Sequence, residues 1–374
     1  MSSVLNDMLY LTICGINGAK PDKEKVEKID MPQLFSACQS HSLTALVCYA
    51  LESADVKNNA FIEAKNKSIR KNMMLDAERK KIFCYMEKNG VKHMALKGAI
   101  LKDIYPKIGM RQMSDNDILF DGKYREKMHG YMLHNGYKTE MYDIEHHDEY
   151  LKPPLYNFEL HAVLCPKKVN EVWYNYYANV WDRLIKDETK EYNYFFKNED
   201  YYIFMLLHEY RHFSQSGAGL RSLLDSYVYL GKYEDSLDFD YIKKECAKLE
   251  IDDFEEKTRI LSKKVFNKGE TEPLTDDEKA MLNYYLGSGT YGNLKNLINN
   301  RISEIQAKDK PVTQTTKIKY IFRRLFPDVK AMKKYYPVLK KHIWLLPFIH
   351  IYRFTVRLAK KFKRVISELK ALLK

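Results

Sequence analysis

The stretch Arg111-Gln-Met-Ser-Asp115-Asn-Asp117-Ile-Leu-Phe120 decides how this chain is interpreted. It ends in an apolar run, which is typical of a buried strand. On a strand, residues i and i+2 project to the same side, so we expect Asp115 and Asp117 side by side while Asn116 points away. Two adjacent carboxylates repel each other unless a cation lies between them. A surface turn is the competing interpretation, because Ser-Asp-Asn-Asp is rich in turn formers.

The flanking sequence favours the strand. Residues 91–96 form a plausible strand, and Lys97-Gly98 then leads into a stretch with helical spacing over 99–105. A glycine at this turn lets the backbone approach a phosphate closely. Downstream, residues 155–164 alternate like a further strand that presents Glu159 and His161 on one face. Glu159 is therefore the natural third carboxylate.

Three neighbouring carboxylates predict a site for Mg²⁺ or Mn²⁺, because hard cations prefer oxygen ligands. Such ions usually keep coordination positions open for water and phosphate oxygens. The ligand we expect is a nucleoside triphosphate such as ATP, although the residues do not select the base.

These residues resemble the polymerase-beta-like nucleotidyltransferases, and within them the bacterial group called uncharacterised nucleotidyltransferases. The resemblance is carried by these elements: Leu96-Lys97-Gly98 with Leu101 and Tyr105-Pro106, Arg111 with Asp115-Asn-Asp117-Ile-Leu, Glu159-Leu-His161, and more weakly His208, His212, Leu220-Arg221 and Asp225. It covers about residues 90 to 230. The wider superfamily usually has Gly-Ser or Gly-Gly at the first turn and Asp at the third carboxylate, and this chain departs at both positions.

The resemblance implies two-metal transfer of a nucleoside monophosphate, with release of pyrophosphate. It assigns the metals and the catalysis to Asp115, Asp117 and Glu159, and the triphosphate to Lys97, Gly98 and Arg111. A further polar group is left either to bind the acceptor or to brace the fold: His161, His208, His212, Arg221 and Asp225.

The expected fold class is α+β, with a small mixed-sheet nucleotidyltransferase core between helical regions. We expect an N-terminal helical region over 1–88, the α/β core over 89–168, a helical domain that completes the cleft over 169–300, and a basic tail over 301–374. Helices are expected from Met31, over 61–86 and over 123–134, and a further strand over 137–142.

Composition points to a cytoplasmic enzyme. The six cysteines show no C-x-x-C pair and no metal-ligand spacing, which favours reduced thiols. The N-terminus lacks the basic flank and apolar core of a signal peptide, and no apolar segment is long enough to span a bilayer.

The positive charge is concentrated in the tail. Residues 301–374 hold 20 Lys or Arg and 4 Asp or Glu, a net of +16, so residues 1–300 carry −4 within a total of +12. The tail contains an apolar, aromatic run over 340–353 and then helical apolar spacing over 354–372. Residues 338–374 could therefore lie on an anionic membrane surface, or pack on the protein's own core. Nucleic acid is a less favoured partner, because no recognised RNA-binding motif accompanies the charge.

Two other functions stay open. His208-Glu209-Tyr-Arg-His212 matches the H-E-x-x-H pattern of zinc metalloproteases, in which the histidines bind zinc and the glutamate is the general base. The chain could also be a catalytically silent scaffold on a membrane surface. Retention of all three carboxylates argues against that reading, since buried carboxylates without a cation destabilise a fold. The acceptor is open, with a glycan or small molecule weakly favoured, and so is the oligomeric state.

Overall fold

The structure is a computed structural model of the full chain. It describes residues 3–143, 147–267, 272–290, 292–305, 329, 332–333, 336–353 and 355. The chain divides into two compact units: Met1–Tyr210 with Gly219–Thr290, and Arg211–Ala218 with Tyr291–Lys374.

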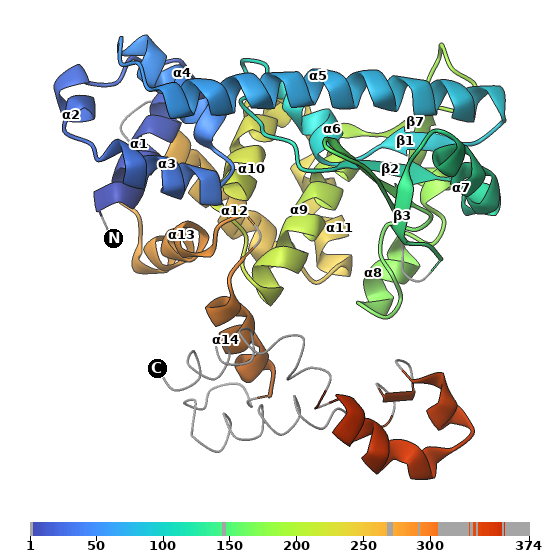
Figure 1. Ribbon diagram of the computed structural model, residues 1–374. Coiled ribbons are helices and arrows are strands. Elements are labelled where there is room, and N and C mark those ends of the chain that lie inside the picture. Colours follow the sequence, from blue (N-terminus) through green and yellow to red (C-terminus); the bar gives the residue numbers. More distant parts are fainter. Residues whose placement is uncertain are drawn as a thin grey trace. The chain divides into compact units, whose positions relative to one another are not determined.

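The first unit begins with five helices: α1 (Ser3–Asn17), α2 (Lys23–Glu27), α3 (Met31–Ser40), α4 (Thr44–Ser53) and α5 (Asn59–Lys88). Helix α5 begins where the Asn58 side chain accepts hydrogen bonds from the Ala60 and Phe61 backbone N–H groups. Its 30 residues give it a length of about 45 Å. It therefore extends from the N-terminal helices to the strands, as Figure 1 shows. The sequence predicted one or two helices here, and the structure has one.

The strands that carry the carboxylates form a five-stranded mixed sheet. They are β1 (His93–Ala95), β2 (Asn116–Phe120), β3 (Lys138–Met141), β4 (His147–Lys152) and β5 (Tyr156–His161), in the order β1-β2-β5-β4-β3. Strands β2 and β5 are parallel, and the other neighbours are antiparallel. Between β1 and β2 lie α6 (Gly98–Leu101) and the 3₁₀ helix η1 (Lys102–Ile104), and α7 (Arg125–His134) follows β2. The α+β fold class is confirmed.

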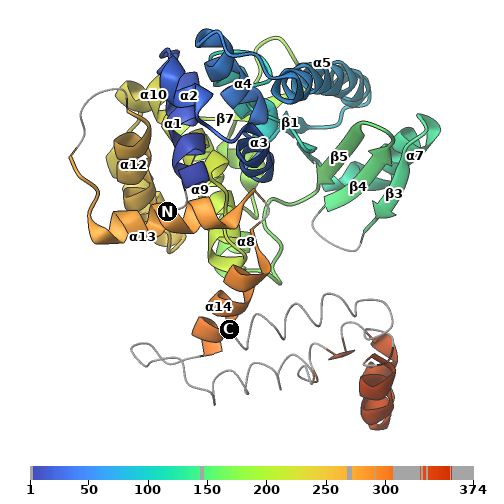
Figure 2. The same cartoon turned by 60° about the vertical axis from the view of Figure 1, so that its left-hand side comes forward.

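One face of this sheet is buried against α5 and α7, which Figure 2 shows beside the strands. Its apolar residues share one core: Ile118, Phe120, Tyr150, Phe158 and Leu160 from the sheet, Leu75, Ile82 and Met86 from α5, and Met128 and Met132 from α7. Because side chains alternate along a strand, Asp117, Glu159 and His161 project from the opposite face. Burial of the apolar face thus fixes which face carries the polar groups.

The remaining elements are mainly helical. In chain order they are η2 (Gly122–Tyr124), α8 (Glu171–Tyr176), η3 (Val180–Arg183), the paired strands β6 (Leu184–Lys186) and β7 (Tyr194–Phe196), α9 (Asn198–Gln215), α10 (Leu220–Tyr233), η4 (Glu234–Ser236), α11 (Phe239–Lys248), α12 (Asp252–Phe266), α13 (Asp276–Ser288), α14 (Leu294–Ile305), η5 (Pro337–Lys340) and η6 (Ile343–Leu345). Helix α9 ends in the second unit, which also holds α14, η5 and η6.

The tail is described only in part. Residues 346–353 are helical, whereas the apolar spacing expected over 354–372 lies almost entirely outside the described residues. Among the helices that the structure does describe, none combines the length and the apolar character needed to cross a bilayer.

Candidate active site

The two central parallel strands bring the predicted carboxylates together. Asp117 on β2 lies directly opposite Glu159 on β5. Asp115 precedes the first residue of β2, so it stands at the entry to the strand and not within it. Asn116 points to the other face, where its side chain bonds the Leu75 carbonyl oxygen. The expected alternation of these side chains is therefore observed.

Asp117 is the most tightly held of the three carboxylates. Its Oδ1 accepts hydrogen bonds from Lys97 Nζ at 2.7 Å and from His161 Nε2 at 2.8 Å. Burial opposes the charge on Asp117, but Lys97 and His161 outweigh it and hold the pKa of this carboxyl well below its usual range. Asp117 is therefore ionised, with a cation already beside it.

Asp115 is in the opposite electrostatic situation. Ser114 Oγ donates to its Oδ1 at 2.9 Å. Burial raises the pKa of Asp115, and the negative charge of Asp117 raises it further; Lys97 offsets only part of this. Lys97 bonds Asp117, and Lys71 and Arg221 add positive charge near Asp115. The pKa of Asp115 is raised nevertheless, so a bound cation would be favourable here.

Lys97 reaches Asp117 from a strained turn. Its backbone has φ 47° and ψ −121°, a region that residues with a side chain rarely adopt. The Lys97 carbonyl oxygen accepts a hydrogen bond from Tyr201 Oη on α9 at 2.7 Å. A hydrogen bond from α9, which is far away in the sequence, therefore stabilises the turn. The turn places the Lys97 ammonium group beside Asp117 on the sheet.

Gly98 is required by a neighbouring side chain. A Cβ atom at Gly98 would lie 2.3 Å from Arg111 Nη1 and 2.9 Å from Met113 Sδ. The glycine therefore makes room for the Arg111 guanidinium, a reason that the sequence did not reveal.

Arg111, which we expected at the triphosphate, has two of its donor nitrogens on Asp225. Its Nε and Nη2 donate to the two carboxylate oxygens, each at 2.8 Å, and Tyr105 Oη donates to Asp225 Oδ1 at 2.7 Å. Arg221 Nη1 donates to the Gln112 carbonyl oxygen at 2.9 Å. The buried contacts among Tyr105, Arg111 and Asp225, which we call the α10 brace, fasten the segment before β2 to α10, and the half-buried Arg221 adds its bond to Gln112.

The remaining histidines of the expected polar group are not part of the brace contacts described above. His161 bonds Asp117 in the carboxylate cluster. His208 is half-buried on α9 in the first unit, and His212 belongs to the second unit. The five polar residues that the resemblance grouped together therefore lie in at least two separate sets of contacts.

From the sequence alone, segment 143–149 invites a metal-site interpretation, but a strand or loop rim is favoured because adjacent histidines alternate sides on a strand, so His147 was not assigned to the site. His147 on β4 lies opposite His161 on β5. In the part of the chain that the structure describes, His147, Glu159 and His161 are the one group of three metal-ligating side chains whose ligand atoms all lie within 4.8 Å of one another. Burial lowers the pKa of His147, and the neighbouring His161 lowers it further, so its neutral, ligating form is favoured.

The metalloprotease interpretation is not supported by the surroundings of Glu209. Its carboxyl group is buried and accepts hydrogen bonds from Tyr285 Oη at 2.7 Å and from Ser226 Oγ at 3.4 Å. Burial raises the pKa of Glu209 to about 8. A carboxyl group enclosed among α9, α10 and α13 is a core contact between helices, not a base beside bound zinc.

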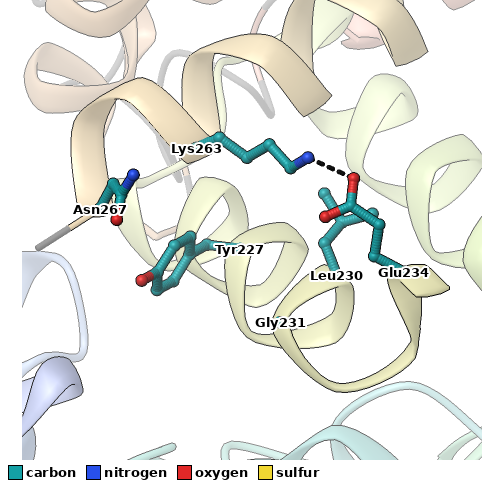
Figure 3. Close-up of a pocket in the computed structure, with 6 residues that line it drawn as sticks. All are labelled: Tyr227, Leu230, Gly231, Glu234, Lys263 and Asn267. Atoms are coloured by element: carbon teal, nitrogen blue, oxygen red, sulfur yellow. Dashed lines mark hydrogen bonds and ion pairs between the residues drawn. The ribbon is translucent and has the colours of Figure 1, made fainter. Parts of the chain in front are cut away.

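A small pocket lies elsewhere, between α10 and α12. It has a volume of about 250 Å³ and is lined by Tyr227, Leu230, Gly231, Glu234, Lys263 and Asn267. Figure 3 shows the ion pair between Lys263 and Glu234 at its side. None of the three carboxylates lines this pocket, so it is separate from the cluster.

Comparison with known proteins identifies the family of this chain. The family described as "Uncharacterised nucleotidyltransferase" matches residues 27–267, which include the whole carboxylate cluster and the α10 brace. This match spans more than half of the chain, so the protein belongs to that family, and its reaction class is nucleotidyl transfer. No curated protein and no solved structure matches the chain.

Proposed function

We propose that this protein transfers a nucleoside monophosphate from a nucleoside triphosphate to a hydroxyl or phosphate acceptor, in a reaction that depends on a divalent metal. The observation that carries the proposal is the parallel register that sets Asp117 opposite Glu159, with Asp115 beside them. Membership of the nucleotidyltransferase family supports the reaction class.

The residues fit a divalent cation. Asp115, Asp117 and Glu159 offer hard oxygen donors, the type that Mg²⁺ and Mn²⁺ prefer. Burial and then the charge of Asp117 raise the pKa of Asp115, and a bound cation would favour its ionised form. When bound, the ion neutralises charge on the phosphate oxygens.

The proposed chemistry is an in-line displacement at the α-phosphorus. A bond forms between an acceptor oxygen and the α-phosphorus, the bond from that phosphorus to the bridging oxygen breaks, and pyrophosphate leaves. Glu159 is 19% exposed, so its carboxylate is accessible to orient the acceptor hydroxyl and to take its proton.

Lys97 is proposed to bind the triphosphate. Its side chain is 20% exposed and its ammonium group already lies at the carboxylate cluster, so a side-chain rotation would bring it to a phosphate oxygen. Gly98 leaves room for the Arg111 guanidinium, and Arg111 acts as a positioning residue: it holds the segment before β2 through Asp225 and does not contact phosphate. We favour a glycan or a small molecule as the acceptor.

The test is calorimetric titration of ATP, GTP, CTP and UTP in the presence of Mg²⁺. We expect one nucleotide to bind the wild type, and Asp115→Asn/Asp117→Asn to lose that binding. Asp253→Asn, which removes a carboxylate that is 79% exposed, serves as the matched control and should bind like the wild type. Absence of binding for all four nucleotides would overturn the proposal and favour a silent scaffold.

A second proposal concerns the second unit, which we infer binds an anionic membrane surface. Trp344, Phe348, Ile351 and Tyr352 recur at helical spacing and are each at least 60% exposed. They lie within a tail of net charge +16, and aromatic side chains beside cationic ones are typical of interfacial segments.

Flotation of the full chain with vesicles of phosphatidylserine and phosphatidylcholine tests this second proposal. Trp344→Ala/Phe348→Ala should reduce binding, and Ile108→Ala, which truncates an exposed apolar side chain of the first unit, should not. Equal binding to purely neutral vesicles, or retention of binding in the double variant, would exclude an anionic surface as the partner.

A further inference from the structure

We propose that His147, Glu159 and His161 form a second type of metal site, which takes a transition-metal ion with nitrogen and oxygen ligands. The inference shares Glu159 with the proposed function but does not depend on nucleotide binding.

The sheet itself assembles these three side chains. His147 on β4 lies opposite His161 on β5 in an antiparallel pair, and Glu159 precedes His161 by two residues. All three therefore project from the same face of neighbouring strands. Strand pairing on both sides of β5 fixes their backbone positions before any ion binds.

Their spacing suits ligands of one ion. Glu159 Oε2 lies 3.5 Å from His161 Nε2 and 3.7 Å from His147 Nε2, and the two imidazole rings are 5.1 Å apart. These nitrogen–oxygen distances exceed the usual hydrogen-bond range of about 2.7–3.2 Å. Two ligands at about 2.1 Å from a tetrahedral ion lie roughly 3.4 Å apart, so small side-chain movements would complete the site.

The donor atoms select the class of ion. Imidazole nitrogen suits Zn²⁺, Co²⁺, Ni²⁺ and Fe²⁺, whereas Mg²⁺ and Mn²⁺ favour oxygen ligands. The side chain of His161 is 3% exposed, and those of His147 and Glu159 are 12% and 19% exposed, which gives an ion access from one side. Asp117 Oδ1, 2.8 Å from His161 Nε2, is the nearest further oxygen ligand.

Ion binding would therefore change the carboxylate cluster. His161 Nε2 cannot both donate a proton to Asp117 and ligate a metal, so loading exchanges that hydrogen bond for a metal bond. Asp117 then either stays paired with Lys97 or becomes a further ligand of the ion. A transition metal would thus bind without nucleotide. The hydrogen bonding of Asp117 would then depend on whether this metal site is occupied.

Co²⁺ added to the purified full chain provides the probe, because its visible absorption reports nitrogen ligands and low coordination number. We expect a saturable spectrum in the wild type, binding at least about tenfold weaker in His147→Ala, and similarly weakened binding in Glu159→Gln. His208→Ala is the matched control and should retain the wild-type spectrum. Far-ultraviolet circular dichroism of each variant shows whether the sheet is intact.

Two results would overturn the inference. One is a folded His147→Ala variant that binds Co²⁺ like the wild type, and the other is loss of the spectrum in folded His208→Ala. Nucleotide titration with Mg²⁺ on the same wild-type sample separates the two proposals: Co²⁺ binding without nucleotide binding would contradict the proposed function alone.

Discussion

The carboxylate cluster and the α10 brace both bury charged groups, yet they differ in how those charges are matched. In the brace, Asp225 receives two donors from Arg111 and one from Tyr105, so its carboxylate is fully engaged. In the cluster, Lys97 interacts with Asp115, Asp117 and Glu159. The pKa of Asp115 is still raised, although Lys71 and Arg221 add positive charge near it. Removing one partner of a matched buried pair is costly because it leaves an uncompensated charge, whereas a buried group with a perturbed pKa marks a candidate functional site. We therefore assign a structural role to the α10 brace and a ligand-binding role to the carboxylate cluster.

The largest effect should come from the brace. Asp225→Ala leaves the Arg111 guanidinium buried without its carboxylate, and we expect a loss of about 3–5 kcal/mol in the free energy of unfolding. Urea denaturation measures this loss. Asp253→Asn, at an exposed position, should change stability by less than about 0.5 kcal/mol. A cost below about 1 kcal/mol for Asp225→Ala would show that the pair is not a brace.

A pH effect should follow from Glu209. Burial raises the pKa of its folded-state carboxyl group to about 8 from an ordinary 4.5, so the folded state holds a proton that the unfolded state releases. This contribution to stability is full below about pH 4.5 and is lost as the pH rises toward 8. Glu209→Gln keeps an acceptor for Tyr285 but does not titrate.

We therefore expect Glu209→Gln to be more stable than the wild type at pH 8, by about 3–4 kcal/mol, and nearly equal to it near pH 5. Urea denaturation at the two pH values decides the matter. A variant that is destabilised equally at both would mean that Glu209 is ionised in the fold.

Two neighbouring carboxylates should respond in opposite directions. Lys97 and His161 favour the ionised form of Asp117, so Asp117→Asn should cost roughly 1–3 kcal/mol at pH 7 without metal. The raised pKa of Asp115 means that its charge opposes folding, so Asp115→Asn should gain up to about 1 kcal/mol.

The pH dependence has opposite signs too. The stability from Asp117 is lost as the pH falls below its ordinary pKa, whereas that from protonated Asp115 is lost as the pH rises through the ordinary aspartate pKa and above. Thermal denaturation of both variants in a chelating buffer measures the contrast. Equal destabilisation by the two substitutions would contradict the prediction that the charge of Asp117 favours folding while that of Asp115 opposes it.

The smallest effect concerns the backbone of Lys97. Lys97→Gly and Lys97→Ala both remove the ammonium group, so their difference reports the cost of φ 47° for a residue with a side chain. We expect the glycine variant to be more stable than the alanine variant by about 1 kcal/mol in urea denaturation. If alanine is as stable as glycine, the turn is not strained.

Alternation along single strands made much of the cluster predictable. The pattern around Asp115-Asn-Asp117 and around Glu159-Leu-His161 indicates which side chains share a face, because the side-chain period of a strand is two. The helices at Met31 and over 123–134 were predictable from their spacing, and the structure begins them at Met31 and Arg125. These predictions depend only on residues close together in the chain.

Pairings between distant segments were not predictable in that way. Arg111 and Asp225 are 114 residues apart, and nothing local indicates that they meet. His147 was not assigned to the site although a signal existed: a hairpin centred on Pro154 places it opposite His161, because each lies seven residues from that centre. Testing each short connection as a hairpin would have found it.

The most direct test of the central claim is the electron paramagnetic resonance signal of Mn²⁺, measured with a non-hydrolysable nucleoside triphosphate. The free-ion signal should fall when wild type is added, and stay high with Asp115→Asn/Asp117→Asn, while Asp253→Asn behaves as wild type. That result would show that Mn²⁺ binds with the nucleotide at Asp115 and Asp117. Equal loss of the free-ion signal with the double variant would contradict the claim, because the ion would then bind elsewhere.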